Sequence, residues 1–159
     1  MTRNGDVLLS EMPKVGENAP DFELQNSRGE KIKLSAFKGK NIALYFYPAD
    51  FTSGCTAQAC NLRDNFLDLK KNNIVVLGVS TDTVESHKKF IEKYNLQFEL
   101  LADKNAEVSK KFGVFGKKNV FGKISLGIKR TTFLIDEKGK IKEVIASVDV
   151  GNHAKQIIK

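Results

Sequence analysis

The chain has 159 residues, 41% of them hydrophobic, which is enough for a single domain over 1–159 whose core needs no disulfides. It holds no run of roughly 20 apolar residues and no N-terminal apolar segment of signal-peptide length, so we expect a soluble cytosolic protein that does not enter a membrane. Lys and Arg number 26 against 19 Asp and Glu, and this net charge of +7 could attract nucleic acid, anionic membrane or acidic partners without deciding among them.

The first predicted pair of elements is a strand followed by a helix. The segment "NIALYFYP", 41–48, is a short apolar and aromatic run closed by proline, which is typical of a buried strand. Apolar residues recur at i, i+4 and i+7 from Leu62, so one helix with one apolar face is expected from about Gly54 to Lys71. The loop that joins strand and helix leads into both cysteines of the chain.

Two more strands and two more helices are predicted in the middle of the chain. The segments "NIVVLGVS", 73–80, and "FELLAD", 98–103, have the apolar content of strands. Between them, Asp82 with Glu85 three residues later has the form of a capping box, which predicts a helix start there. The segment 104–113 predicts a short helix that ends at its last residue, a glycine.

A basic and aromatic segment follows, "KKFGVFGKKNVFGK" at 110–123. Its lysines alternate with Phe112, Phe115 and Phe121, a pattern that single-strand nucleic-acid binders use for phosphates and base stacking. We favour the alternative of a Gly-rich solvated loop whose Phe side chains turn inward. A basic nucleic-acid-binding module that uses this segment stays the second hypothesis for the protein.

The last third of the chain predicts a hairpin and a terminal helix. Two β-rich runs within 131–147 are joined around "DEKG", which is typical of a hairpin. Strands therefore alternate with helices up to a final antiparallel pair. This order predicts an α/β fold, with a central mixed sheet and helices on both faces.

The two cysteines, Cys55 and Cys60, are separated by four residues. In a reducing compartment a close pair points to transient redox chemistry or to a metal site rather than to a structural disulfide. Zinc needs four ligands, and the two histidines, His87 and His153, are far from the cysteines in sequence. We interpret His87 as a helix-face residue and His153 as part of a C-terminus that frays, so no metal is expected.

Cys55 is predicted to lie where a buried strand passes into a helix. The first helical turn offers unpaired amide donors and the positive end of the helix dipole, which stabilise a thiolate and make it a nucleophile. Pro48 fixes the chain as it leaves the strand, Thr52 can turn its hydroxyl towards the sulfur, and Gly54 allows close approach of a small substrate. The alternative, a small buried apolar residue, does not suit so polar a loop.

These residues carry a family resemblance. The stretch "YFYPADFTSGCTAQAC" resembles the active-site segment of the peroxiredoxins, and the second cysteine after four residues resembles the bacterioferritin comigratory protein branch, also called PrxQ. The segments 15–24, 76–103, 110–118 and 127–141 are similar to that branch in the same order. The resemblance thus covers most of the chain.

The resemblance implies a thioredoxin-like fold and an antioxidant peroxidase that reduces hydrogen peroxide and alkyl hydroperoxides without a cofactor. By position, Cys55 is the peroxidatic cysteine, Cys60 the resolving cysteine that forms a disulfide with it, and Thr52 the hydroxyl that orients peroxide. Pro48 shields the pocket and Arg130 is the supporting cation, although without the resemblance Arg130 would be an ordinary strand arginine. The implied partner is thioredoxin or a similar dithiol, with no nucleic acid, no membrane and a monomeric protein.

Three departures from the branch pattern concern loop rigidity and substrate preference, namely Ser53, Phe51 and Thr131. A disulfide reductase of thioredoxin type is a further alternative, but that activity normally needs a CxxC motif, which the chain lacks. On one regular helix, the Cα atoms of Cys55 and Cys60 would lie roughly 8.6 Å apart, beyond the about 7 Å that a disulfide tolerates. The helix must therefore unwind locally before the two sulfur atoms can bond.

Overall fold

The structure is a computed structural model that describes residues 11–120 and 122–158. Its strands are β1 (Glu23–Gln25), β2 (Lys31–Lys33), β3 (Asn41–Phe46), β4 (Ile74–Ser80), β5 (Glu99–Ala102), β6 (Phe115–Val120), β7 (Lys123–Ile128), β8 (Thr131–Ile135) and β9 (Ile141–Ile145). Its helices are the 3-10 turn η1 (Leu34–Phe37), α1 (Ser53–Asp64), α2 (Phe66–Lys71), α3 (Val84–Tyr94), α4 (Glu107–Lys111) and α5 (His153–Ile157).

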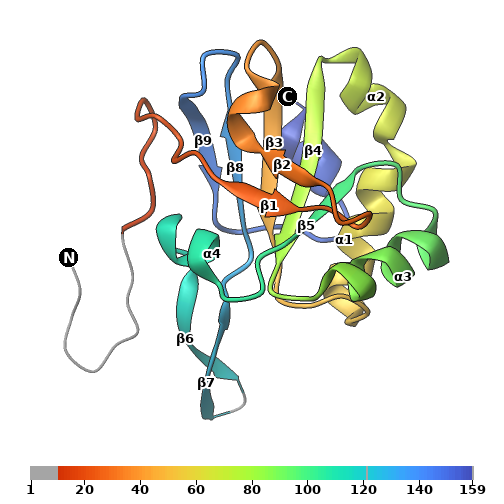
Figure 1. Cartoon of the computed structure of the whole chain (residues 1–159), viewed down its shortest axis with the longest axis vertical. Coiled ribbons are helices and arrows are strands. Elements are labelled where there is room, and N and C mark those ends of the chain that lie inside the picture. The colour runs from red at the N-terminus through yellow and green to blue at the C-terminus, as the bar shows by residue number, and fades with distance from the viewer. Residues whose placement is uncertain (1–10, 121, 159) are drawn as a thin grey trace.

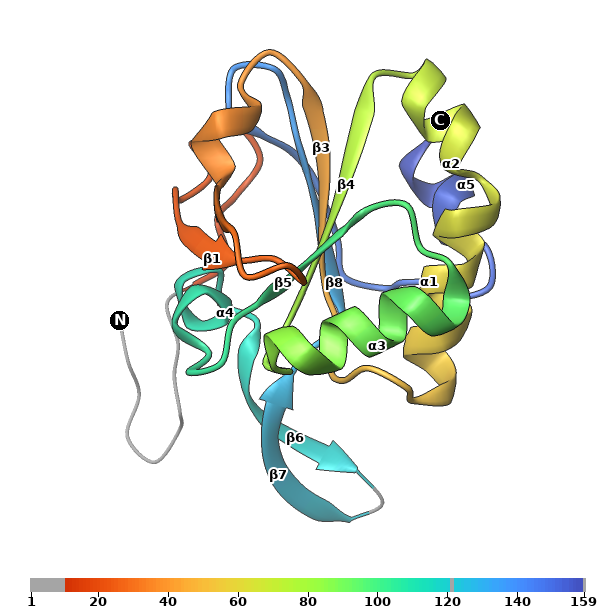
Figure 2. The same cartoon turned by 45° about the vertical axis from the view of Figure 1, so that its right-hand side comes forward.

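Seven strands form one mixed sheet in the order β2-β1-β5-β4-β3-β8-β9 (Figure 1). The strands β3, β4 and β5 run parallel, and β8 and β9 add an antiparallel hairpin on one side. The helices α1, α2, α3 and α5 cover one face, while η1 and α4 cover the other (Figure 2). The predicted α/β class, with a central mixed sheet and helices on both faces, is confirmed.

Strand β3 divides its side chains between the two halves of the core. Ala43, Tyr45 and Tyr47 contribute to the apolar cluster under α1, whereas alternate residues such as Leu44 and Phe46 contribute to the cluster on the opposite face. This period of two, with every residue buried from 42 to 47, is what a strand covered on both faces requires. Strand β3 therefore holds the start of the cysteine loop on a rigid base.

The predicted helix over 54–71 is interrupted. It consists of α1 and α2, with Asn65 between them in a non-helical conformation at φ −109° and ψ 17°. The Asn65 side chain donates a 2.8 Å hydrogen bond to the carbonyl oxygen of Asn61, and such local bonds of asparagine compete with helix continuation. The cysteines thus lie on a short helix of 12 residues that can change shape without α2.

The predicted capping box at Asp82 is wrong. Thr83 caps α3 instead, since its Oγ1 accepts a 3.1 Å hydrogen bond from the amide of Ser86. The Asp82 carboxylate does not cap the helix. Its Oδ2 accepts one hydrogen bond from the amide of Asp50 at 2.8 Å and another from the hydroxyl of Ser80 at 2.6 Å. Aspartate and threonine are both good helix caps. The hydrogen bonds of Asp82 to Asp50 and Ser80 left Thr83 as the cap of α3.

The segment 110–123 is not a solvated loop. Apart from Phe121, which lies outside the described residues, it comprises the end of α4, a short connection and most of a β-hairpin, formed by β6 and β7, that projects from the body (Figures 1 and 2). Phe112 is fully buried, and Phe115 is half-buried and packs against the core, so neither ring is presented for base stacking. The nucleic-acid alternative loses its main support here.

The C-terminus is docked rather than frayed. His153 at the start of α5 is fully buried, with Nε2 2.8 Å from the hydroxyl of Thr132 and Nδ1 2.7 Å from the side-chain oxygen of Gln156. The side chain of Asn61 on α1 accepts from the amide of Ala154 at 2.8 Å. A five-residue helix is not stable alone, so these contacts hold α5 in place.

The stability of the protein should fall in acid because of His153. Burial lowers the pKa of His153, so below the unfolded value of about 6.5 the unfolded chain takes up a proton that the folded chain does not. The free energy of unfolding therefore decreases as pH falls below that value. Urea unfolding between neutral and mildly acidic pH measures this, and His153→Gln should show a shallower decrease. Equal slopes in parent and variant would contradict it.

One domain over all of 1–159 stays a prediction, since residues 1–10 and 159 lie outside the described residues. It is consistent with a sheet whose strands run from β1 to β9 and with α5 packed on α1. Within the described part of the chain, no helix combines the length and the apolar content that crossing a bilayer needs.

Candidate active site

Cys55 lies in the first turn of α1, directly after the loop that leaves β3. Thr52 takes the extended N-cap conformation at φ −80° and ψ 155°, and its carbonyl accepts the first helical hydrogen bond, from the amide of Thr56 at 2.8 Å. Cys55 is only 2% exposed, and its thiol is free. Cys55 thus lies at the N-terminal end of α1, the positive end of the helix dipole, and a helix N-terminus favours a nearby negative charge.

Arg130, in the link between β7 and β8, reaches the cysteine. Its Nη1 lies 3.4 Å from the Sγ of Cys55 and donates a 2.7 Å hydrogen bond to the Oε1 of Gln58. A side chain at position 54 would place its Cβ 3.1 Å from Nη2 of Arg130. Glycine at 54 therefore makes room for the guanidinium beside the sulfur.

Thr52 and Pro48 lie in the loop that leads from β3 to the helix of Cys55. The Thr52 hydroxyl donates to the carbonyl of Ala49 at 2.9 Å and makes no capping bond to the helix. With its hydrogen engaged, the hydroxyl oxygen still has lone pairs to accept a hydrogen bond. Thr52 is exposed and Pro48 half-buried, so both are at the rim of the site rather than in the core.

Cys60 is half-buried and free, and it belongs to the same helix as Cys55. Both lie within α1, so the estimate of roughly 8.6 Å between their Cα atoms on a regular helix applies. The structure thus has both cysteines as thiols, on a helix that must unwind before they can bond.

Comparison with known proteins supports one family. The model of the AhpC/TSA family matches residues 15–144. The putative peroxiredoxin Bcp of Coxiella burnetii is 48% identical over 145 residues, which cover 91% of this chain and 96% of that protein. Peroxiredoxin Bcp of Bacillus subtilis is 44% identical over 146 residues, covering 92% and 93%. The chain belongs to the peroxiredoxin family.

Solved structures agree with that membership. A mutant of PrxQ from Xylella fastidiosa matches this peroxiredoxin with a TM-score of 0.86 at 30% identity, over 93% of this chain and 94% of that one. The bacterioferritin comigratory protein of Xanthomonas campestris matches with a TM-score of 0.83 at 32% identity, over 91% and 94%. The thioredoxin-like fold and the resemblance to the Bcp and PrxQ branch are confirmed. This peroxiredoxin is a peroxidase, an oxidoreductase that reduces peroxides at the expense of thiols.

Gln58 is a site residue that sequence analysis missed. It is fully buried, its Oε1 accepts from Arg130, and its Nε2 has no hydrogen-bond partner among the described residues. Its spacing of three residues from Cys55 places both on one face of α1, which is the signal that could have revealed it. A buried amide N–H without a partner is costly, so it is available to bond an oxygen that arrives at the site.

Tyr45 is a second residue near the site that the sequence analysis did not identify. Its hydroxyl is buried and has no hydrogen-bond partner within 11–120 and 122–158, and its ring stacks on Tyr47 with centroids 5.3 Å apart. Burial raises the pKa of Tyr45 well above its usual value, and the charge of Cys55 adds to the rise. The group therefore stays a neutral hydroxyl that can donate a hydrogen bond, and it belongs to the same apolar cluster as Cys55. Nothing in the sequence distinguished it from other aromatic residues of β3.

Lys118 of β6 brings a further cation to the neighbourhood of the site. Its Nζ donates to the carbonyl of Ile128 at 2.8 Å, two residues before Arg130. Burial, and then repulsion by Arg130, lower the pKa of Lys118, while the charge of Cys55 opposes this. The β6–β7 hairpin thus contributes positive potential next to the cysteine as well as the link that carries Arg130.

His87 lies on the buried face of α3. It is fully buried, and its Nδ1 lies 2.8 Å from the carboxylate of Asp50 in the cysteine loop. Asp50, Asp82 and His87 offer ligand atoms within 4.8 Å of one another. The Asp50 oxygens already accept hydrogen bonds from Tyr47, Ser86 and His87, so the donor set is satisfied by the protein and we assign no metal to it.

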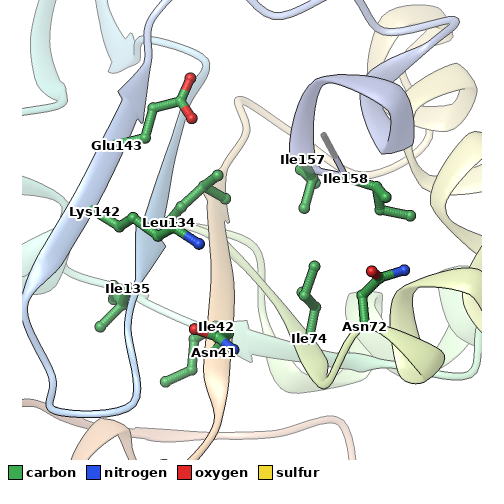
Figure 3. Close-up of a pocket in the computed structure, with 10 residues that line it drawn as sticks. All are labelled: Asn41, Ile42, Asn72, Ile74, Leu134, Ile135, Lys142, Glu143, Ile157 and Ile158. Carbon is green, nitrogen blue, oxygen red and sulfur yellow. The ribbon is translucent and has the colours of Figure 1, made fainter.

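A hollow of about 200 Å³ lies at the other end of the sheet (Figure 3). Asn41 and Ile42, which begin β3, line it together with Ile157 of α5. The cysteine loop follows the opposite end of β3, so this hollow is separate from the peroxide site.

Proposed function

We propose that this peroxiredoxin reduces hydrogen peroxide and alkyl hydroperoxides with the Cys55 thiolate, that Cys60 resolves the product as an intramolecular disulfide, and that thioredoxin or a similar dithiol restores both thiols. The observation that carries the proposal is the 3.4 Å contact between Arg130 Nη1 and Cys55 Sγ at the first turn of α1. A helix terminus and a guanidinium together favour negative charge on the sulfur and on an oxygen next to it.

In the first step the Cys55 sulfur attacks the outer oxygen of the peroxide. The O–O bond breaks, its electron pair stays on the inner oxygen, and that oxygen takes a proton and leaves as water or an alcohol. Cys55 becomes a sulfenic acid, oxidised by two electrons. In this proposal Arg130, whose Nη1 lies 3.4 Å from Cys55 Sγ, and the unpaired Nε2 N–H of Gln58 donate to the oxygens as charge develops on them; among the described residues that N–H has no other partner.

In the second step the Cys60 sulfur attacks the Cys55 sulfur. A disulfide forms and the sulfenic oxygen leaves as water with the thiol proton. A dithiol then attacks the disulfide, becomes a disulfide itself and leaves Cys55 and Cys60 reduced. The second step requires α1 to unwind over its first turns, which is inexpensive near a helix end.

The substrate range, the setting and the assembly state belong to the same proposal. The Xanthomonas campestris relative is described by its alkyl peroxide reduction activity, which supports alkyl hydroperoxides as substrates here.

A cytosolic setting would keep the cysteine pair reduced between turnovers. We also propose a monomer that needs no cofactor, because all parts of the cycle come from one chain; light scattering of the reduced protein measures the mass.

The proposed cycle is tested by mapping the oxidised protein. Reduced protein treated with one equivalent of hydrogen peroxide should contain a disulfide between Cys55 and Cys60 within one chain, found by peptide mass mapping. In Cys60→Ser the same treatment should leave a sulfenic acid on Cys55, trapped by a dimedone reagent, and turnover should then depend on a small thiol. A sulfenic acid trapped on Cys60 in Cys55→Ser, or a disulfide between chains, would contradict the proposed roles.

Thr52→Val is expected to slow the attack on peroxide. The variant keeps the shape of the side chain but removes the oxygen that can accept a hydrogen bond from the peroxide hydroxyl. The second-order rate constant should drop by roughly ten- to a hundredfold, about 1.4 to 2.8 kcal/mol of barrier. Competition with horseradish peroxidase for hydrogen peroxide measures that constant. Ser53→Ala, which removes an exposed hydroxyl next to it, is the matched control. A Thr52→Val rate equal to that of the parent would leave Thr52 with only its bond to Ala49.

A further inference from the structure

The loop that leads to Cys55 is tied to α3 by one carboxylate. Asp50 Oδ1 accepts a 2.6 Å hydrogen bond from the hydroxyl of Tyr47, and Oδ2 accepts one of 2.8 Å from the hydroxyl of Ser86. Oδ2 also lies 2.8 Å from Nδ1 of His87, and the side chains of this pair are 1% and 0% exposed. The amide of Asp50 donates to Asp82 at 2.8 Å. Four groups around Asp50, namely Tyr47, Ser86, His87 and Asp82, therefore define one position of the loop.

The hydrogen-bond partners of His87 show where its ring hydrogens lie. Nε2 of His87 lies 3.0 Å from the carbonyl oxygen of Leu101, which can only accept, so Nε2 carries a hydrogen. The 2.8 Å contact between Nδ1 of His87 and Oδ2 of Asp50 requires a hydrogen between the two atoms. Removal of either member leaves a buried polar group without its partner, and such a loss is large.

The residue after Asp50 is strained. Phe51 has φ +66°, in the left-handed region that a residue with a large side chain rarely adopts. Its ring is 46% exposed and meets Phe90 of α3 edge to face at 5.0 Å. Strained backbone persists only where its surroundings over-determine it, and here those surroundings are Asp50 and α3. The next residue is Thr52, the N-cap of the helix that carries Cys55.

We propose that Asp50, held by His87 and Ser86, is a positioning residue that keeps the cysteine loop in the conformation that attacks peroxide and opposes the unwinding that disulfide formation needs. The inference rests on the proposed function of Cys55 and Cys60. When the clamp is intact, Thr52 and the first turn of α1 stay in place around the sulfur. When it is broken, the strain at Phe51 favours release of the loop, and α1 begins to unwind at its N-terminus.

The two half-reactions should therefore respond in opposite directions. Asp50→Asn keeps the size of the side chain but cannot accept from all of its donors, so we expect the attack on peroxide to slow by about tenfold. Disulfide formation from the sulfenic acid should accelerate several-fold, because the folded state is destabilised relative to the unwound one. General damage to the fold would slow both steps, so the opposite signs identify a positioning role.

The experiment measures both steps in the parent, Asp50→Asn, Ser86→Ala and Lys88→Ala. Ser86→Ala removes one donor to Asp50 without touching a charged group, so it should fold and show the same signs with smaller size. Lys88 is exposed on the same helix, and its variant should match the parent. Competition with horseradish peroxidase gives the attack rate, and acid quenching followed by mass spectrometry gives the rate of disulfide formation.

Two further measurements depend on the proposed release of the cysteine loop. A sulfenic acid that is resolved sooner has less time to meet a second peroxide, so the sulfinic fraction of Cys55 at high peroxide should fall in Asp50→Asn. Amide exchange over the N-terminal half of α1 should be faster in reduced Asp50→Asn than in the parent. Exchange equal to the parent, or a larger sulfinic fraction, would overturn the inference.

The outcomes separate this inference from the proposed function. If the parent forms no disulfide between Cys55 and Cys60, the proposed function fails and the inference fails with it. If the parent forms the disulfide and the variants form it at the same rate or slower, the inference alone is overturned. Slower attack with faster disulfide formation in both Asp50→Asn and Ser86→Ala supports it.

Discussion

Cys55→Ser should have no peroxide turnover with dithiothreitol, with thioredoxin or with any other reductant. A serine hydroxyl is far less nucleophilic than a thiolate at neutral pH, and the remaining cysteine, Cys60, lies on a different face of α1 without the contact to Arg130. Peroxide consumption in excess reductant measures the effect. The rate should equal that of reductant and peroxide without protein.

Cys60→Ser is the matched control for that loss. It removes a thiol from the same helix, yet it should consume about one equivalent of peroxide before a small thiol is needed. Circular dichroism of both variants should equal that of the parent, since neither serine changes the packing of α1 greatly. Retention of even a tenth of the parent activity in Cys55→Ser would count against Cys55 as the nucleophile.

Arg130→Lys is the second change with a large expected effect. A lysine keeps the charge but lacks the planar fork that lies 3.4 Å from Cys55 Sγ and at the same time donates to Gln58 at 2.7 Å. Loss of a preorganised donor to developing charge typically slows a reaction by 10²–10³, so we expect a decrease of roughly a hundredfold in the rate of peroxide attack. Competition for hydrogen peroxide against horseradish peroxidase measures this decrease.

The control for Arg130→Lys is the same change at an exposed arginine. Arg28 pairs with Glu30 and Glu99 near the turn between β1 and β2, and 59% of its side chain is exposed. Arg28→Lys should leave the rate unchanged, since exposed ion pairs contribute little. If Arg130→Lys attacked peroxide as fast as the parent, the role of Arg130 would be reduced to packing beside Gly54.

The order of the main elements and the candidate nucleophile, Cys55, could be predicted from local sequence. The apolar runs that became β3, β4 and β5 and the hairpin of β8 and β9 are short, continuous and closed by turn residues, so periodicity and length located them. Cys55 could be singled out because a buried strand, a polar loop and a helix start are all visible within a few residues. The three-residue strands β1 and β2 carry too short a pattern for that method.

Local sequence did not predict the structure where it suited two alternatives equally well. Asp82 and Thr83 are both acceptable helix caps, and only the tertiary bonds of Asp82 to Asp50 and Ser80 decided for Thr83. The lysines and glycines of 115–128 suit a solvated loop as well as an exposed hairpin, and the pairing of β6 with β7 decided for the hairpin. The bond between Asp50 and Asp82 joins residues 32 apart in sequence, so no short window shows it.

The candidate site was decided by tertiary structure. Sequence alone predicted a candidate nucleophile, Cys55, at the start of the helix that follows a buried strand, and a second cysteine on the same helix. It could not bring Arg130, 75 residues away, to Cys55, or His87, 37 residues away, to Asp50. The physical reason is the sheet: β3 and β4 are adjacent and parallel, so the loop after β3 and the helix after β4 begin at the same edge, while antiparallel β8 begins there beside β3.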